Sequence, residues 1–253
     1  MNQAVEQIKP YDAEGSKTEQ VRDMFDSIAP AYDFMNRAMT LGIDRWWRRV
    51  AVRCVARHLQ NTPTPQLLDV ATGTGDFAIQ LQRSIADATV NGIDLSQGML
   101  DVARNKVAER GLQDAITFEQ GDCLAMPYED SSFDAVTVAF GVRNFEHLDR
   151  GYREMYRVMR PGGIVCVLEL STPQNCLVRW FYDLYTLHII PWAGSLKSGD
   201  KNAYRYLPQS IAAVPQGDAM LDIMRQAGFT QCRANTLTLG TCTIYLGVKE
   251  IKS

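Results

Sequence analysis

The sequence lacks a long uncharged apolar run. Its longest stretch without charged side chains, residues 234–248, is mostly polar and is shorter than the roughly 20 apolar residues that cross a bilayer. Residues 1–17 also lack the apolar centre of a secretory signal. These absences exclude an integral membrane protein and predict a cytoplasmic one.

Cysteine, histidine and charge of one sign are also limited. The six cysteines contain no CxxC pair and do not cluster with the three histidines, so we expect reduced thiols, no disulfide framework and no bound metal. The 26 Lys and Arg residues nearly balance 29 Asp and Glu residues, which gives a net charge of −3. This balance predicts no nucleic-acid partner, because a general attraction to polyanions needs a large positive charge.

The sequence alternates between strand-like and helix-like segments, as in an α/β protein. The 253 residues are 46% hydrophobic, enough for one large domain or a domain with an appendage. After residue 65, short apolar runs alternate with turns and helical stretches, as in βα units of a parallel sheet. A glycine-threonine turn separates the last two runs, so the sheet should end antiparallel. The predicted strands are residues 66–71, 88–95, 115–120, 133–140, 164–170, 229–239 and 242–248.

The chain is expected to divide into a helical cap and a main domain that contains these strands. Residues 1–65 form a predicted helical cap, with helices at 19–28 and 44–59 and a proline-containing linker before the sheet. Residues 66–253 form the main domain, and a helical insertion at about 175–212 follows the fifth strand. The Arg160-Pro-Gly-Gly163 segment is expected to end a helix and start that strand.

The most informative segment is the glycine-rich loop of residues 69–78, DVATGTGDFA, between a predicted strand and a predicted helix. Glycines here allow a tight turn and a close approach of a ligand to the backbone. The pattern fits both NAD and S-adenosylmethionine. We expect Asp69, Asp76, Asp94 and Asp122 to surround the ligand, which favours the cationic S-adenosylmethionine over an anionic diphosphate.

The loop, Asp94 and Asp122 resemble the motifs of class I S-adenosylmethionine-dependent methyltransferases. Residues 32–36 with 39–47, and residues 157–163 with 168–171, resemble the two signatures of the ubiquinone/menaquinone biosynthesis C-methyltransferase family. The likeness runs from about Lys17 to the C-terminus. It implies a doubly wound, mostly parallel, seven-stranded Rossmann-like sheet. Asp44 replaces a histidine common in the first signature, and Ala139 replaces a small hydroxyl residue.

The resemblance implies S-adenosyl-L-methionine as cofactor, bound by Gly73, Thr74, Gly75, Asp94, Asp122 and Cys123. It also implies C-methylation of a lipid-tailed quinol, and demethylmenaquinol is the preferred acceptor. Alternatives are a polyprenyl methoxybenzoquinol of ubiquinone biosynthesis, another small molecule, an NAD-dependent oxidoreductase or a non-catalytic binding module.

A quinol carbon becomes nucleophilic when a neighbouring hydroxyl loses its proton, so the site needs a phenolate-stabilising cation and a base. We expect Arg143 and Asn144 to stabilise the phenolate, Asp33 to help take the proton, and Tyr32 to close over the same sheet edge. His147 is an alternative base. The aromatic residues 180–185 and 189–192 suit an isoprenoid tail or the inner face of a membrane; packing on the sheet or a homodimer contact is the alternative.

Overall fold

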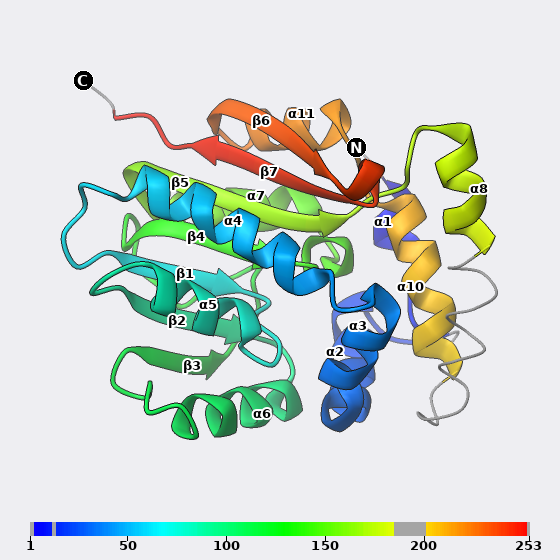
Figure 1. The fold of residues 1–253 in the computed structure, drawn as a ribbon, viewed down its shortest axis with the longest axis horizontal. Helices are drawn as coiled ribbons and strands as arrows, with labels where there is room; N and C mark the ends of the chain where they lie inside the picture. The colour runs from blue at the N-terminus through cyan, green and yellow to red at the C-terminus, as the bar shows by residue number, and fades with distance from the viewer. Residues whose placement is uncertain (1–2, 12–13, 185–200, 252–253) are drawn as a thin grey trace.

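The computed structural model describes residues 3–11, 14–184 and 201–251. Within these residues one seven-stranded sheet runs through the molecule in the order β3-β2-β1-β4-β5-β7-β6 (Figure 1). The strands are β1 (Gln66–Val70), β2 (Thr89–Asp94), β3 (Ile116–Gln120), β4 (Phe133–Ala139), β5 (Met159–Leu170), β6 (Thr230–Leu237) and β7 (Cys242–Val248).

The pairing of the strands confirms the predicted fold class. Strands β1 to β5 pair in parallel, whereas β7 lies antiparallel between β5 and β6. The chain moves outward from β1 to β3 and then returns to β4 on the other side of β1. This reversal creates the crevice in which open α/β sheets bind their ligands, at the carboxyl ends of the strands.

Helices cover both faces of the sheet. Helices α4 (Asp44–His58), α5 (Asp76–Ser84) and α6 (Gln97–Ala108) lie on the face towards the viewer in Figure 1. Helices α7 (Leu148–Val158) and α11 (Asp218–Gln226) lie on the other. Each layer encloses its own hydrophobic cluster with the strands, because the strands are buried on both sides.

Two local predictions differ from the structure. Residues 160–163 lie within β5, where the register with β4 shifts and Gly162 adopts a φ of +84°. They therefore form an irregularity in the strand, because glycine tolerates this backbone conformation without ending the pairing. The turn between β6 and β7 is a 3-10 turn, Thr238–Gly240 (η4), in place of a two-residue hairpin turn.

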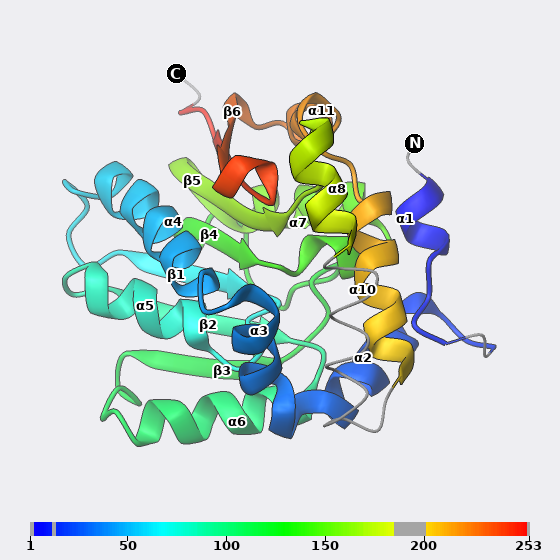
Figure 2. The same ribbon diagram turned by 45° about the vertical axis from the view of Figure 1, so that its right-hand side comes forward.

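The cap contains more helix than the sequence pattern indicated. It includes α1 (Gln3–Gln7), α2 (Lys17–Ile28), η1 (Ala29–Ala31) and the unpredicted α3 (Tyr32–Thr40). Figure 2 shows α2 and α3 at the carboxyl edge of the sheet, beside α10 (Lys201–Ala213). Helix α4 instead packs on the sheet through Trp47, Ala51 and Val55, so the linker before residue 66 does not separate two cores.

The predicted insertion contains α8 (Cys176–Leu184) and α10 among the described residues. Leu177 and Trp180 on α8 are exposed. The aromatic run expected at residues 189–192 lies outside the described residues. No helix in the part of the chain that the structure describes is long and apolar enough to cross a bilayer.

Candidate active site

Two cavities meet at the carboxyl edge of the sheet. The first, of about 690 Å³ including open solvent at its mouth, lies at the ends of β1, β2 and β4 beneath α2. The second, of about 1120 Å³ on the same measure, lies between α3, the start of α4, α10 and η4. Tyr32 and Phe140 line both cavities, and a ligand in one would therefore lie next to a ligand in the other.

The glycine loop forms one wall of the first cavity. Gly73 has a φ of +56°, and no atom lies within 4 Å of the position that a Cβ would take. Gly75 has a φ of +76° and has no such space, since a Cβ there would approach Phe118 to 2.9 Å and Ala103 to 3.1 Å. Gly73 therefore leaves room for a ligand, whereas Gly75 allows close packing of the loop on β3 and α6.

Asp94 ends β2 and lines the first cavity. Its carboxylate accepts hydrogen bonds from the backbone N–H of Gly73 at 2.8 Å and of Ser96 at 2.9 Å. Burial raises the pKa of Asp94 to about 6, and those two backbone hydrogen bonds act in the opposite direction. The carboxylate thus ties the glycine loop to the next βα turn and keeps lone pairs at the cavity wall.

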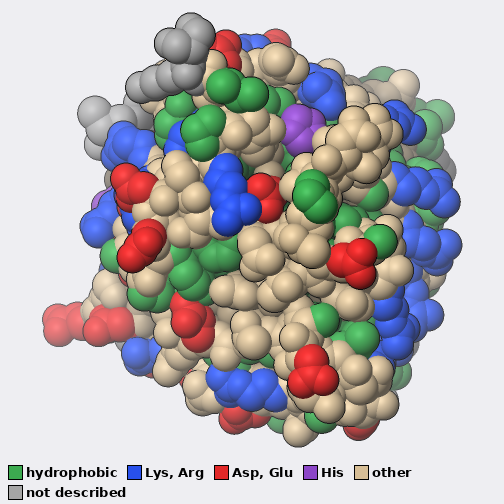
Figure 3. Space-filling model, turned by 90° about the vertical axis from the view of Figure 1, so that its left-hand side faces the viewer, with side chains coloured by type: hydrophobic (Ala, Val, Ile, Leu, Met, Phe, Trp, Pro, Cys, Tyr) green, Lys and Arg blue, Asp and Glu red, His purple; other side chains and the backbone are tan. Residues whose placement is uncertain are grey.

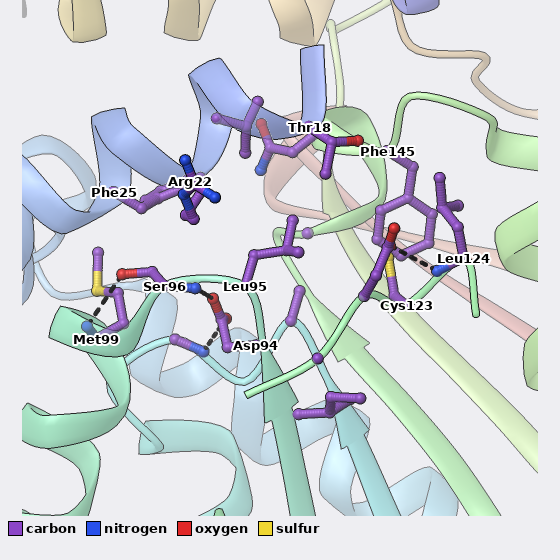
Figure 4. A pocket seen from close by; sticks show the side chains of 18 of the residues that line it. Thr18, Arg22, Phe25, Asp94, Leu95, Ser96, Met99, Cys123, Leu124 and Phe145 are labelled. Carbon is purple, nitrogen blue, oxygen red and sulfur yellow. Dashed lines mark hydrogen bonds between the residues drawn. The ribbon is translucent and has the colours of Figure 1, made fainter. Parts of the chain in front are cut away.

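The rest of this cavity comes from the β3–β4 loop and from α2. Asp122 and Cys123 line it, and the Asp122 carboxylate fixes its own loop by accepting from the N–H of Leu124 at 2.8 Å. Figure 4 shows α2 lying across the cavity, with Arg22 and Phe25 on the side opposite Asp94. Of the predicted cofactor residues, Gly73, Asp94, Asp122 and Cys123 come together here.

Hydrogen bonds to carboxylates connect both ends of α2 to other parts of the chain. At its start, Glu146 accepts hydrogen bonds from the backbone N–H groups of Lys17 and Thr18 and from the Thr18 hydroxyl. Near its end, Asp26 accepts from the Ser96 hydroxyl at 2.6 Å and from the N–H of Gly98 at 2.9 Å. Helix α2 is therefore held over the cavity near both of its ends.

The expected ring of four aspartates is corrected by the structure. Asp69 and Asp76 do not line the first cavity; they line a smaller adjoining one. Asp69 accepts hydrogen bonds from two threonine hydroxyls, and burial raises the pKa of its carboxyl to about 6. Asp76 lies 2.6 Å from Lys106 and 3.4 Å from Arg48. Burial opposes its ionisation, but these cations hold its pKa below the usual value, so Asp76 presents no unpaired charge against a diphosphate.

Lys106 connects the glycine loop to the cap. Its Nζ lies 2.5 Å from Asp33, 2.6 Å from Asp76 and 3.0 Å from the Thr74 hydroxyl, which itself donates to Asp33 at 2.6 Å. Thr74 and Asp33 therefore face each other in the smaller cavity, away from the two larger ones. Lys106 could not be predicted from the sequence beyond its place on a helical stripe, because its partners are distant in the chain.

Arg143 lines the second cavity and is almost fully buried. Its guanidinium lies 2.7 Å from Glu169 and donates to the carbonyl oxygen of Phe140, while its Nε has no hydrogen-bond partner among the described residues. Burial disfavours the charge on Arg143, but the Glu169 carboxylate outweighs this effect and raises the pKa of the guanidinium. The site thus holds a fixed, permanently protonated guanidinium, paired with Glu169, at an apolar cavity.

The other predicted site residues, Asn144, Tyr32 and His147, differ in which of the two larger cavities they line. Asn144 lines the first cavity and accepts from the Tyr206 hydroxyl at 3.2 Å. Tyr32 borders both, and burial raises the pKa of its phenol. His147, the alternative base, is exposed, directly precedes α7 as its N-cap and lines neither cavity. The 3-10 turn Val142–Asn144 (η2) therefore places Arg143 at the second cavity and Asn144 at the first, and both residues also line a smaller third cavity.

Asp44, which replaces the family histidine, lies in the second cavity. It is buried, forms an ion pair with Arg48 and accepts a hydrogen bond from the Thr40 hydroxyl at 2.8 Å. The spacing of Asp44 and Arg48, one turn apart on α4, favours this pair. Asp44 is therefore an acidic group that borders the acceptor space, whereas Asp33 does not line that cavity.

Phe140 separates the two cavities in a strained conformation. Its φ is +61°, which costs a residue with a side chain about 1–2 kcal/mol. The backbone N–H of Phe140 donates to Leu168 at 2.7 Å, its carbonyl accepts from Arg143, and its ring packs edge-on against Trp47. Strain maintained by several contacts at a ligand site is typical of a functional turn.

Comparisons with known proteins identify the family. A sequence profile of the ubiE/COQ5 methyltransferase family matches residues 13–249. The chain belongs to this family. It is 47% identical over 249 residues to a demethylmenaquinone methyltransferase of Bacteroides fragilis, covering 98% of this chain and 100% of the relative. It is 42% identical to a ubiquinone/menaquinone biosynthesis C-methyltransferase UbiE of Geotalea daltonii, with 92% and 97% covered.

A solved structure of much lower sequence similarity shares the fold. A SAM-dependent methyltransferase from Thermotoga maritima, described as a possible histamine N-methyltransferase, superposes with a TM-score of 0.61. It shares 16% sequence identity, with 90% of this chain and 99% of that chain covered. The chain is thus an S-adenosylmethionine-dependent methyltransferase of class I fold, which removes the NAD-dependent and non-catalytic alternatives.

The first cavity suits this cofactor. The open position at Gly73 admits a ligand against the backbone, and Asp94 offers carboxylate oxygens that can accept from ribose hydroxyls. Apolar side chains of Ile93, Met99 and Leu124 complete a surface for a flat base. The charge also fits, because Asp94 and Asp122 favour a cationic ligand.

Proposed function

We propose that this enzyme methylates a ring carbon of a lipid-tailed quinol, with demethylmenaquinol as the acceptor. The observation that carries the proposal is the second cavity, which is mainly apolar, contains the fixed cation Arg143 and shares Tyr32 and Phe140 with the cofactor cavity. The name of the Bacteroides fragilis relative supports the naphthoquinol. The name of the Geotalea daltonii relative covers both quinones, so a polyprenyl methoxybenzoquinol is the second candidate.

Bound S-adenosylmethionine supplies the electrophilic methyl group. The chain must then orient the acceptor, withdraw the proton of its hydroxyl and stabilise the resulting phenolate. Arg143 is suited to the last task, because its charge is fixed by Glu169 before any substrate binds. Preorganised charge of this kind loses little free energy to reorganisation during the reaction.

We propose that Asp44 accepts the proton of the quinol hydroxyl, since Asp44 borders the acceptor cavity and is held in place by Arg48. Both carboxylates have hydrogen-bonded or ion-paired oxygens, but Asp33, the residue expected for this role, does not line the acceptor cavity. We therefore propose Asp33 as a positioning residue for the glycine loop. Tyr32, between the cavities, and Asn144, on the cofactor side, then orient the two reactants towards each other.

The purified enzyme should be incubated with S-adenosylmethionine and chemically reduced demethylmenaquinone, next to a reduced benzoquinone acceptor. S-adenosylhomocysteine and the mass gain of one methyl group are followed together. Turnover on the naphthoquinol is the expected result. Turnover on the benzoquinol alone would move the substrate to the second candidate, and cofactor binding without turnover on either would refute a quinol acceptor.

The homodimer contact expected from the aromatic segment stays a prediction. Leu177 and Trp180 are exposed on α8, and a contact through them would bury apolar surface. Sedimentation of the wild type and of a Leu177→Ser variant tests it; equal sedimentation as a monomer would contradict it.

A further inference from the structure

The outward face of α4 carries a stripe of arginines. Arg45, Arg49, Arg53 and Arg57 recur every four residues and are all exposed. Among the residues that the structure describes, no carboxylate is paired with any of the four. Figure 3 shows basic side chains gathered along the right-hand edge, the side of α4. The stripe extends over about 18 Å at the helical rise per residue.

Exposed apolar side chains adjoin the start of this stripe. Leu41 precedes α4 and is 81% exposed, Trp46 on α4 is 43% exposed, and Leu239 in η4 is 77% exposed. The Trp47 indole N–H donates to the Thr238 hydroxyl at 2.7 Å, which holds η4 against α4. Leu41 and Thr238 both line the second cavity, so this group of exposed apolar residues adjoins that cavity.

The backbone at the two leucines makes their exposure unusual. Leu41 has a φ of +51° and Leu239 a φ of +56°, a conformation that asparagine or glycine adopts at lower cost. Neither side chain gains burial in return. A leucine that is both strained and exposed fits a surface that becomes covered when an apolar partner arrives.

We infer that the α4 arginine stripe, together with Leu41, Trp46 and Leu239, docks on an anionic lipid bilayer. The arginines match lipid phosphates, and the tryptophan and leucines suit the interfacial region. A second copy of the chain fits less well, because a twofold contact through this face would bring two unneutralised arginine stripes together. Docking would open the second cavity towards the lipid, and a quinol could then enter while its tail stays in the bilayer.

This inference rests on the proposed function for the identity of the quinol, but lipid binding is measured without it. The full chain is floated with vesicles of phosphatidylcholine, with or without phosphatidylglycerol. We expect binding to the anionic vesicles, weakened by salt. An Arg49→Gln/Arg53→Gln variant should bind about 25-fold more weakly, from about fivefold per arginine.

The matched control removes two exposed arginines from the other face of the sheet. An Arg153→Gln/Arg225→Gln variant loses the same charge from α7 and α11 and should bind like the wild type. Leu239→Asn should weaken binding with no loss of stability, because asparagine tolerates this backbone conformation. Equal loss in the control, no loss in the α4 variant, or no binding of the wild type to anionic vesicles would overturn the inference.

Activity separates this inference from the proposed function. On a short-tailed quinol in solution, Arg49→Gln/Arg53→Gln should turn over like the wild type. On a long-tailed quinol in anionic vesicles, its KM should rise with kcat retained. Absence of turnover by the wild type on the short-tailed quinol would count against the function alone. Concentration-dependent dimers that the α4 variant abolishes would assign the face to a second copy and overturn the lipid inference.

Discussion

Lys106 on α6 and Asp33 on α3 form an ion pair, with Nζ and Oδ2 2.5 Å apart, although 73 positions separate them in the chain. The same ammonium group contacts Asp76 on α5 and the hydroxyl of Thr74. One side chain therefore connects the cap, the glycine loop and the first helix after it. This cation is thus one of the contacts that hold α3 of the cap against the glycine loop.

Lys106→Met should lower the free energy of unfolding by about 2 kcal/mol, since two largely buried carboxylates lose their cation. It should also weaken cofactor binding several-fold, because the glycine loop loses a contact to the cap. Urea unfolding and calorimetric titration with S-adenosylhomocysteine measure the two effects. Lys106→Arg keeps the charge and should retain most of both; equal losses in the two variants would contradict a role for the charge.

Cofactor affinity should depend on pH through Asp94. Its pKa in the free enzyme is raised to about 6, and binding ribose hydroxyls favours the ionised carboxylate as acceptor. Affinity for S-adenosylhomocysteine should thus be constant above this pKa and fall by up to about tenfold per pH unit below it. In Asp94→Asn the affinity should be lower and this pH dependence absent. A slope that persists in the variant would locate the titrating group elsewhere.

Asp44 and Asp33 should differ in the kinetic step that they affect. Asp44→Asn removes the group bordering the acceptor cavity and should lower kcat by about 100-fold or more, within the range of general base catalysis. Asp33→Asn should chiefly raise the KM for S-adenosylmethionine, because it weakens the contacts to Thr74 and Lys106. Steady-state kinetics with each substrate varied in turn distinguish them. The assignment reverses if Asp33→Asn carries the larger loss in kcat.

Arg143→Lys tests the fixed cation without leaving Glu169 unpaired. Lysine keeps the charge but lacks the planar set of donors that contacts both Glu169 and the Phe140 carbonyl. We expect kcat to fall about 100-fold while the dissociation constant of S-adenosylhomocysteine stays unchanged, as for the loss of one preorganised donor. Full turnover with unchanged cofactor binding would show that the reaction does not need the planar donor set of Arg143.

The sequence alone determined the class of fold and the location of the cofactor loop. Alternating apolar runs and helical stretches are local patterns, so they predicted the parallel sheet and its antiparallel end. Gly73, Asp94 and Asp122 were also predictable, because each directly follows or ends a strand and the carboxyl ends of parallel strands share one edge. The family signatures extended this reading to the enzyme class.

Only the tertiary structure decided how charges pair and which cavity each residue lines. Asp69, Asp76 and Asp94 look alike in the sequence, yet hydroxyls hold the first, Lys106 and Arg48 neutralise the second, and the third borders the cofactor cavity. Arg143 and Asn144 are neighbours in the chain, yet of the two larger cavities Arg143 lines the acceptor cavity and Asn144 the cofactor cavity. Such contacts join distant segments, and local residue patterns carry no information about them.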